Sequence, residues 1–134
     1  MDNICIVANG IVNGIVALVM PNINSVYRLA IEKFNYTEST SIEEICANQV
    51  VNAFVLDSIH QTGYEQKLKP VELPSLVSLC AEQWSPDNNL LTAAMKLKRV
   101  NIAHQYSAEL ERMFDILRKD PSKIRVRPRK LMNV

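Results

Sequence analysis

Glycine is scarce in this sequence, with only three among its 134 residues. The glycines are too few and too widely spaced to form a GxGxxG or GxxxxGK pattern, in which a glycine-rich backbone binds phosphate. We therefore expect no complete nucleotide-binding site in the chain alone. The acidic residues are scattered, and no carboxylate pair or Ser/His/Asp combination has the local sequence of a catalytic site.

Histidine and cysteine are also few. The two histidines, His60 and His104, and the three cysteines, Cys5, Cys46 and Cys80, form no CxxC or Cys/His cluster. We therefore expect no metal site built by this chain alone. An odd number of widely separated cysteines among apolar neighbours predicts free thiols that fill the core, in a reducing compartment. His60 is expected at the surface or at the edge of the core.

Long apolar runs are absent too. The longest, residues 15–20, is far too short to span a bilayer, and the first ten residues lack the regions of a signal peptide. We therefore expect a soluble, intracellular chain. With 48% hydrophobic and 22% charged residues, it has the composition and length of one globular domain with one core.

The net charge of +1 argues against a dedicated nucleic-acid-binding protein, so no nucleic acid is expected as a partner. The charge is concentrated, however, near the end of the chain. Residues 118–134 have no apolar periodicity and contain one acid, Asp120, against seven basic residues, Arg118, Lys119, Lys123, Arg125, Arg127, Arg129 and Lys130. We expect a domain over residues 1–117 and a basic, disordered tail over residues 118–134.

The first third of the chain has the pattern of a hairpin followed by a helix. Apolar and β-branched residues fill residues 4–8 and 14–20, and the Asn and Gly residues between them readily adopt a positive φ. Pro21 cannot donate to a strand ladder and ends the second strand. Apolar residues at helical spacing predict a helix over residues 24–34.

The rest of the chain predicts further helices and a third strand. Ser41 begins a helix that breaks near Asn48, resumes, and ends around Gly63, which can take the left-handed conformation of a C-cap. Residues 75–81 alternate as in a strand, and residues 100–117 have helical spacing. These elements predict an α+β fold, in which the hairpin and the third strand form a small sheet covered by helices.

Three cations, Lys96, Lys98 and Arg99, follow an apolar run that contains Ala93 and Ala94. A solvated helix face would explain them without any function. Alternatively, a lysine on a backbone anchored by apolar residues on both sides can be aimed at phosphate or carboxylate oxygens. The two alanines fit either close approach to a cleft or tight core packing. Spacing alone favours the solvated face.

Four stretches of the chain, however, resemble motifs of the long-chain acyl-CoA synthetases, in the same order. The most specific is WSPDNNLLTAAMKLKRVNIAHQYSAELERMF, which resembles the C-terminal end of that family. The others are DNICIVANG with VALVMPN, SIEEICAN, and LKPVELPSLVSL. The similarity extends over about residues 2–114 and implies the C-terminal lid domain of an adenylate-forming enzyme. One departure is Asn89, where the family has Gly, and Asn is tolerated there if the position needs a positive φ.

The resemblance implies a mobile lid of a long-chain fatty acid–CoA ligase. In one pose, such a lid inserts a lysine that stabilises charge as the carboxylate attacks the α-phosphate of ATP, and in another pose it helps to close the tunnel for the CoA thiol. Lys96 matches the inserted lysine and is the expected catalytic residue. Lys98 and Arg99 match neighbouring basic positions and are candidates for substrate binding.

The same resemblance implies that another domain binds most of the substrates. ATP and Mg²⁺ are bound mainly by a large N-terminal AMP-binding domain, which also binds the fatty acid and is the expected partner, and CoA is a substrate. That domain is absent from this sequence, so we expect the isolated chain to be inactive. The resemblance suggests the cytosolic face of the endoplasmic reticulum or of the mitochondrial outer membrane, with no anchor in this chain.

A non-enzymatic function is an alternative interpretation. The chain could be a non-catalytic relic, or an interaction module whose basic tail binds a partner protein or an acidic surface. Under this reading, the cations at residues 96–99 are ordinary surface charges. The two readings differ in whether the chain contributes to catalysis when an AMP-binding domain is supplied.

Overall fold

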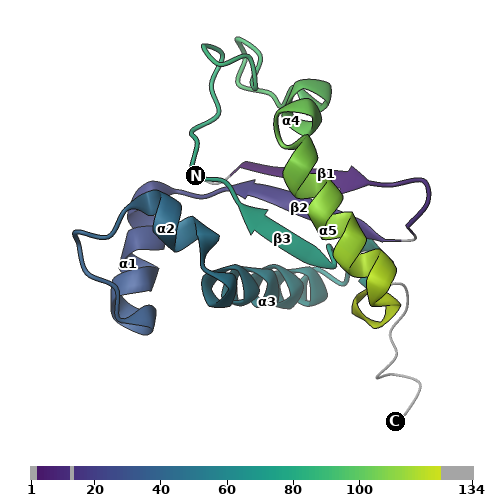
Figure 1. Ribbon diagram of the computed structural model, residues 1–134, viewed down its shortest axis with the longest axis horizontal. Coiled ribbons are helices and arrows are strands. Elements are labelled where there is room, and N and C mark those ends of the chain that lie inside the picture. Colours follow the sequence, from purple (N-terminus) through teal and green to yellow (C-terminus); the bar gives the residue numbers. More distant parts are fainter. Residues whose placement is uncertain (1–2, 13, 125–134) are drawn as a thin grey trace.

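The computed structural model describes residues 3–12 and 14–124 and contains a three-stranded mixed sheet (Figure 1). Strands β1 (Asn3–Ala8) and β2 (Ile15–Met20) pair antiparallel, which confirms the predicted hairpin. Strand β3 (Leu76–Leu79) pairs parallel with β2 and is shorter than the predicted strand over residues 75–81. The strand order β1-β2-β3 leaves β2 in the centre, so its nearly continuous apolar sequence is buried on both faces.

A parallel strand pair needs a crossover connection, and here helices supply it. Helices α1 (Ile23–Phe34), α2 (Ile42–Ala47) and α3 (Gln49–Glu65) lie between β2 and β3 in the sequence and cover one face of the sheet (Figure 1). Their N-caps are side-chain acceptors, as expected for Asn and Ser. The caps are Asn22, Ser41 and Asn48, and Asn48 also ends α2, which confirms the predicted break.

Gly63 does not end its helix, contrary to the prediction. Helix α3 continues to Glu65, and the positive φ after it belongs to Lys67, at 62°. Gly63 is instead buried within the helix against Leu73, since a Cβ at that position would lie 2.3 Å from Leu73 Cδ2. The absence of a side chain therefore serves close packing and not backbone conformation.

The predicted long helix over residues 100–117 is in fact two helices. Helix α4 (Arg99–Gln105) ends at Tyr106, with φ −106° and ψ 26°, and helix α5 (Ser107–Lys119) follows directly. At this junction, the Tyr106 hydroxyl accepts from Trp84 Nε1 over 2.9 Å and donates to Glu82 Oε1 over 3.0 Å. These two helices cover the second face of the sheet (Figure 1).

The core consequently has two parts, one on each face of the sheet. Alternate residues of β2 point to opposite faces. Val16, Leu18 and Met20 pack with α4 and α5, and Ala17 and Val19 pack with α1 to α3.

All three cysteines are buried and free, as predicted. The surface alternative for His60 is wrong, because its side chain is buried with Nε2 2.7 Å from the carbonyl oxygen of Pro74.

Two short 3-10 helices, η1 (Pro70–Glu72) and η2 (Pro121–Lys123), complete the described chain. The ordered structure continues beyond residue 117, because α5 reaches Lys119 and Ile124 packs against the core. The predicted tail lies outside the described residues from 125 onward, so its disorder stays a prediction. Within the part of the chain that is described, no helix has the length and apolarity needed to cross a membrane.

Candidate functional site

Lys96 lies on a small hairpin-like loop and not on a helix face. Leu91 and Leu97 form an antiparallel bridge at the neck of this loop, and Leu91 is only 2% exposed. Beyond the bridge, the Thr92 amide donates to the Lys96 carbonyl over 2.8 Å, and the Lys96 amide donates to Thr92 Oγ1 over 3.1 Å. The turn includes Met95 at φ 64°, a left-handed conformation that is uncommon for a residue other than glycine. The apolar anchoring on both sides of Lys96 is therefore as predicted.

The base of the loop is closed around Asn89. Its side-chain Oδ1 accepts a hydrogen bond from Lys98 Nζ, and its backbone carbonyl accepts from Asn101 Nδ2 of α4 over 2.8 Å. The Lys98 amide donates to the carbonyl of Leu90 over 3.0 Å, which adds a backbone bond across the same base. Asn89 has φ 66°, which confirms that this position needs the positive φ inferred from the resemblance.

The tip of the loop is exposed. Ala93, Ala94 and Lys96 are all exposed, so the alternative of tight core packing for the two alanines is wrong. Met95 is 60% exposed, although its side chain is large and apolar. Among the described residues, no side chain forms a hydrogen bond or ion pair with the Lys96 ammonium. The segment that carries the loop projects beyond the sheet, between β3 and α4 (Figure 1).

The other two cations of the cluster have partners within the domain. Lys98 is held at the base of the loop by Asn89, whereas Arg99 begins α4 and reaches β1. Arg99 Nη1 donates to the Ile6 carbonyl over 3.4 Å and lies 3.9 Å from Cys5 Sγ. The cluster is thus divided, and the structure does not bring the three cations together around one point.

Sequence reasoning missed two residues that shape this site. Thr92 closes the turn, and Tyr106 joins the segment before the loop to the junction of α4 and α5 through its bonds to Trp84 and Glu82. Burial raises the pKa of Tyr106, so its hydroxyl stays protonated and can donate. A hydroxyl residue four positions before the lysine was a visible signal for Thr92, whereas no local pattern identified Tyr106.

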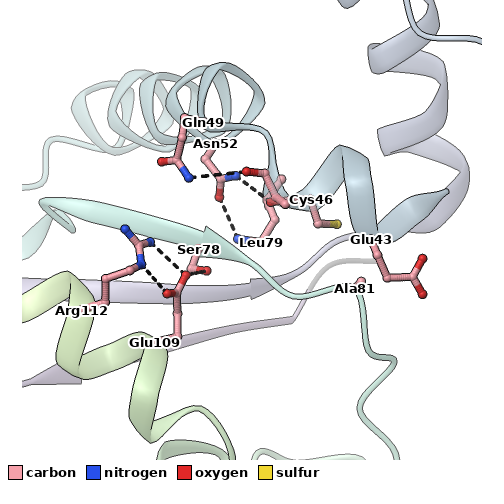
Figure 2. Close-up of a pocket in the computed structure, with 10 residues that line it drawn as sticks. Glu43, Cys46, Gln49, Asn52, Ser78, Leu79, Ala81, Glu109 and Arg112 are labelled. Carbon is pink, nitrogen blue, oxygen red and sulfur yellow. Dashed lines mark hydrogen bonds and ion pairs between the residues drawn. The ribbon is translucent and has the colours of Figure 1, made fainter. Parts of the chain in front are cut away.

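A separate polar pocket of about 400 Å³ lies at the free edge of β3, between α2 and α3 on one side and α5 on the other (Figure 2). Ser78 Oγ donates to Glu109 Oε2 over 2.5 Å, and Arg112 binds both oxygens of Glu109 over 2.6 and 3.0 Å. These bonds, those from Arg112 above all, lower the pKa of Glu109. On the opposite wall, Asn52 Oδ1 accepts from the Leu79 amide over 2.8 Å.

The Asn52 side chain is held from its other end as well. Asn52 Nδ2 donates to the carbonyl oxygens of Cys46 and Asn48 over 2.7 and 2.8 Å. Burial raises the pKa of the Cys46 thiol to about 11, so this group stays in the protonated thiol form at neutral pH. None of the sequence-predicted site residues lines the pocket. Within residues 3–12 and 14–124, no group of three or more His, Cys, Asp or Glu side chains could hold a metal ion.

Known proteins resemble this chain in sequence, and others resemble it in fold. It is 32% identical over 111 residues to long-chain-fatty-acid–CoA ligase 1 of Schizosaccharomyces pombe, covering 83% of this chain and 16% of that protein. It is also 32% identical over 114 residues to long chain acyl-CoA synthetase 8 of Arabidopsis thaliana, covering 85% of this chain and 16% of that protein. No family model matches the chain.

Among solved structures, the fold matches the A-PCP didomain of a carboxylic acid reductase from Segniliparus rugosus, solved in complex with AMP. The TM-score is 0.68 at 17% identity, and the match covers 87% of this chain and 14% of that one. The chain thus spans about one sixth of the length of the curated relatives it matches. With about a third of its residues identical over most of its length, it is homologous to one part of the long-chain acyl-CoA ligases.

Proposed function

We propose that this chain acts as the C-terminal mobile lid of a long-chain fatty acid–CoA ligase and that Lys96 is its catalytic residue. The observation that carries the proposal is the position of Lys96 at the exposed end of a loop whose backbone is fixed. The amide and carbonyl of Lys96 are both bonded to Thr92, and the neck below is anchored by the buried Leu91. A cation held in this way can enter a facing active site with little loss of conformational freedom.

The proposed chemistry is the formation of an acyl adenylate. A fatty-acid carboxylate oxygen attacks the α-phosphorus of ATP, a new P–O bond forms, and pyrophosphate leaves with the electron pair of the broken P–O bond. Negative charge grows on the phosphate oxygens during this step, and the Lys96 ammonium stabilises it. A positioned donor of this kind contributes about 10²- to 10³-fold in rate. CoA then attacks the acyl carbonyl through its sulfur, so that a C–S bond forms, the acyl C–O bond to AMP breaks, AMP leaves with that electron pair, and the thiol proton is released to solvent.

The proposal divides the reaction between two domains. On the family resemblance, ATP, the fatty acid and Mg²⁺ are assigned to an N-terminal AMP-binding domain. Lys98 and Arg99, the other two candidates, are both partly engaged with groups of their own domain. Family resemblance suggests that the assembled enzyme works at the cytosolic face of the endoplasmic reticulum or of the mitochondrial outer membrane.

Complementation tests the proposal. The full chain is mixed with the separately expressed N-terminal domain of a related synthetase, and AMP release is followed with a long-chain fatty acid, ATP and CoA. We expect activity on mixing and loss of that activity with Lys96→Ala. Lys69→Ala serves as the matched control, because Lys69 is another exposed lysine, in the segment between α3 and η1.

Equal activity of the Lys96→Ala and Lys69→Ala chains would contradict the catalytic role of Lys96. No gain on mixing, with a folded chain and an N-terminal domain that is competent with its own lid, would instead favour a non-catalytic interaction module.

A further inference from the structure

We propose that Lys98 is a positioning residue, which acts through its bond to Asn89 to fix the loop that carries Lys96, and that it does not bind substrate. The claim that Lys98 affects catalysis rests on the function proposed above for Lys96. The claim that Lys98 makes the loop rigid rests on the geometry of the domain alone. The two parts can therefore be tested separately.

The two sides of the loop are joined by a short series of backbone contacts. The Leu90 carbonyl accepts from the Lys98 amide over 3.0 Å, Leu91 and Leu97 form the bridge, and the Thr92 amide donates to the Lys96 carbonyl over 2.8 Å. Next to the Leu90–Lys98 backbone bond, the Lys98 ammonium donates to Asn89 Oδ1. This side-chain bond adds one more contact across the base, where the loop joins the domain.

Asn89 is suited to this role by its backbone as well as by its side chain. Its φ of 66° lies in the left-handed region, which Asn tolerates better than most residues other than glycine. Its carbonyl accepts from Asn101 Nδ2 of α4, so the same residue ties the loop to the helix that follows. Opening of the base would therefore release the loop from both its own backbone contacts and α4.

The placement of Lys98 argues against direct contact with a substrate. Leu97 packs against the core, and alternation along the extended segment puts Lys96 and Lys98 on the opposite side. Of these two, Lys96 is exposed near the turn, whereas Lys98 is only half-exposed and its ammonium is engaged by Asn89 at the base. Substrate binding by Lys98 would require this bond to break.

Hydrogen exchange of the full chain tests the structural part. We expect Asn89→Gly and Lys98→Met each to speed exchange of the Thr92 and Lys98 amides by about 3- to 10-fold, as for the loss of one partly exposed bond to a charged group. The double variant should add little to either single variant. Asn89→Asp keeps an acceptor and tolerates positive φ, so it should retain protection. The amides of β2 serve as the internal reference and should not change.

Kinetics in the reconstituted mixture test the functional part. Positioning predicts that Asn89→Gly and Lys98→Met lower kcat for adenylation alike, without raising the KM for ATP, and that Asn89→Asp restores kcat. A raised KM for ATP or CoA in Lys98→Met alone would show that Lys98 binds substrate and would overturn the proposal. Unchanged exchange in Asn89→Gly would overturn it independently of any activity, so a failure of the function proposed for Lys96 is distinguishable.

Discussion

Thr92 and Lys96 are joined by two hydrogen bonds: the Thr92 amide donates to the Lys96 carbonyl over 2.8 Å, and the Lys96 amide donates to Thr92 Oγ1 over 3.1 Å. The backbone of Lys96 is thus fixed without the use of its ammonium group. The backbone of Lys96 is therefore positioned by Thr92, while its ammonium group stays available to stabilise charge. This pairing also makes Thr92 a residue whose loss should affect catalysis more than stability.

Thr92→Val keeps the shape of the side chain but removes the acceptor for the Lys96 amide. We expect adenylation by the reconstituted enzyme to slow by about 3- to 10-fold, since one partly exposed hydrogen bond contributes about 1 kcal/mol to holding the loop. The melting temperature should change little, because the loop lies outside the core. Thr92→Ser retains the hydroxyl and should keep most of the activity. Wild-type rates in the valine variant would refute the role of Thr92.

Asn52→Leu should destabilise the fold strongly. Asn52 is buried, and its side chain satisfies the Leu79 amide and the carbonyl oxygens of Cys46 and Asn48. Leucine fills a similar volume but leaves the Leu79 amide and the Cys46 carbonyl without this side-chain partner, whereas the Asn48 carbonyl keeps the backbone amide of residue 52. We expect a loss of about 2–4 kcal/mol in the free energy of unfolding, measured with urea. Gln61→Leu, at an exposed position of the same helix, should change it by less than about 0.5 kcal/mol. Equal stability of the two variants would contradict the account.

Gly63→Ala should destabilise the protein although alanine is the better helix former. The added Cβ would lie 2.3 Å from Leu73 Cδ2, so the buried Leu73 side chain must shift away from α3. We expect a net loss of about 1–3 kcal/mol in the free energy of unfolding. Leu73→Val makes room at this contact, and in that background the further cost of Gly63→Ala should be smaller. A stabilised Gly63→Ala chain would mean that Leu73 moves aside easily.

Glu109 should make stability fall at acidic pH. Its pKa is lowered, first by the hydrogen bond from Arg112, so the folded state favours the carboxylate. The corresponding stabilisation is present above the ordinary glutamate pKa of 4.5 and is lost as the pH falls through the lowered folded value. Glu109→Gln should therefore flatten the dependence of unfolding free energy on pH in this acidic range, measured by urea titrations. Arg112→Met should flatten it in a similar way, and an unchanged slope in both variants would contradict this assignment.

Local signals in the sequence predicted much of the fold. The apolar runs of the hairpin, the helix ending at Phe34 and the helix break near Asn48 all depend on residues within one or two turns of each other, and all are confirmed. The errors arose where distant residues decide the local structure. Gly63 lies against Leu73, which follows it ten positions later. Tyr106, at the junction of α4 and α5, bonds to Trp84, which lies on another segment.

The same distinction applies to the site. The apolar anchors beside Lys96 were readable from the sequence, as was the tolerance of Asn89 for positive φ. The loop itself was not predicted, because Met95 takes a left-handed conformation without being glycine. The partner of Lys98 could not be predicted either, since spacing alone does not tell which of several adjacent cations folds back onto its own domain.

The most direct measurement compares the two half-reactions in the reconstituted enzyme with wild-type and Lys96→Ala lids. The first is exchange of pyrophosphate into ATP in the presence of a long-chain fatty acid, and the second is thioester formation from preformed acyl adenylate and CoA. We predict that Lys96→Ala lowers the first by about 10²- to 10³-fold and leaves the second within a factor of about two. An unchanged exchange rate, or an equal loss in both half-reactions, would contradict the role of Lys96 in adenylation.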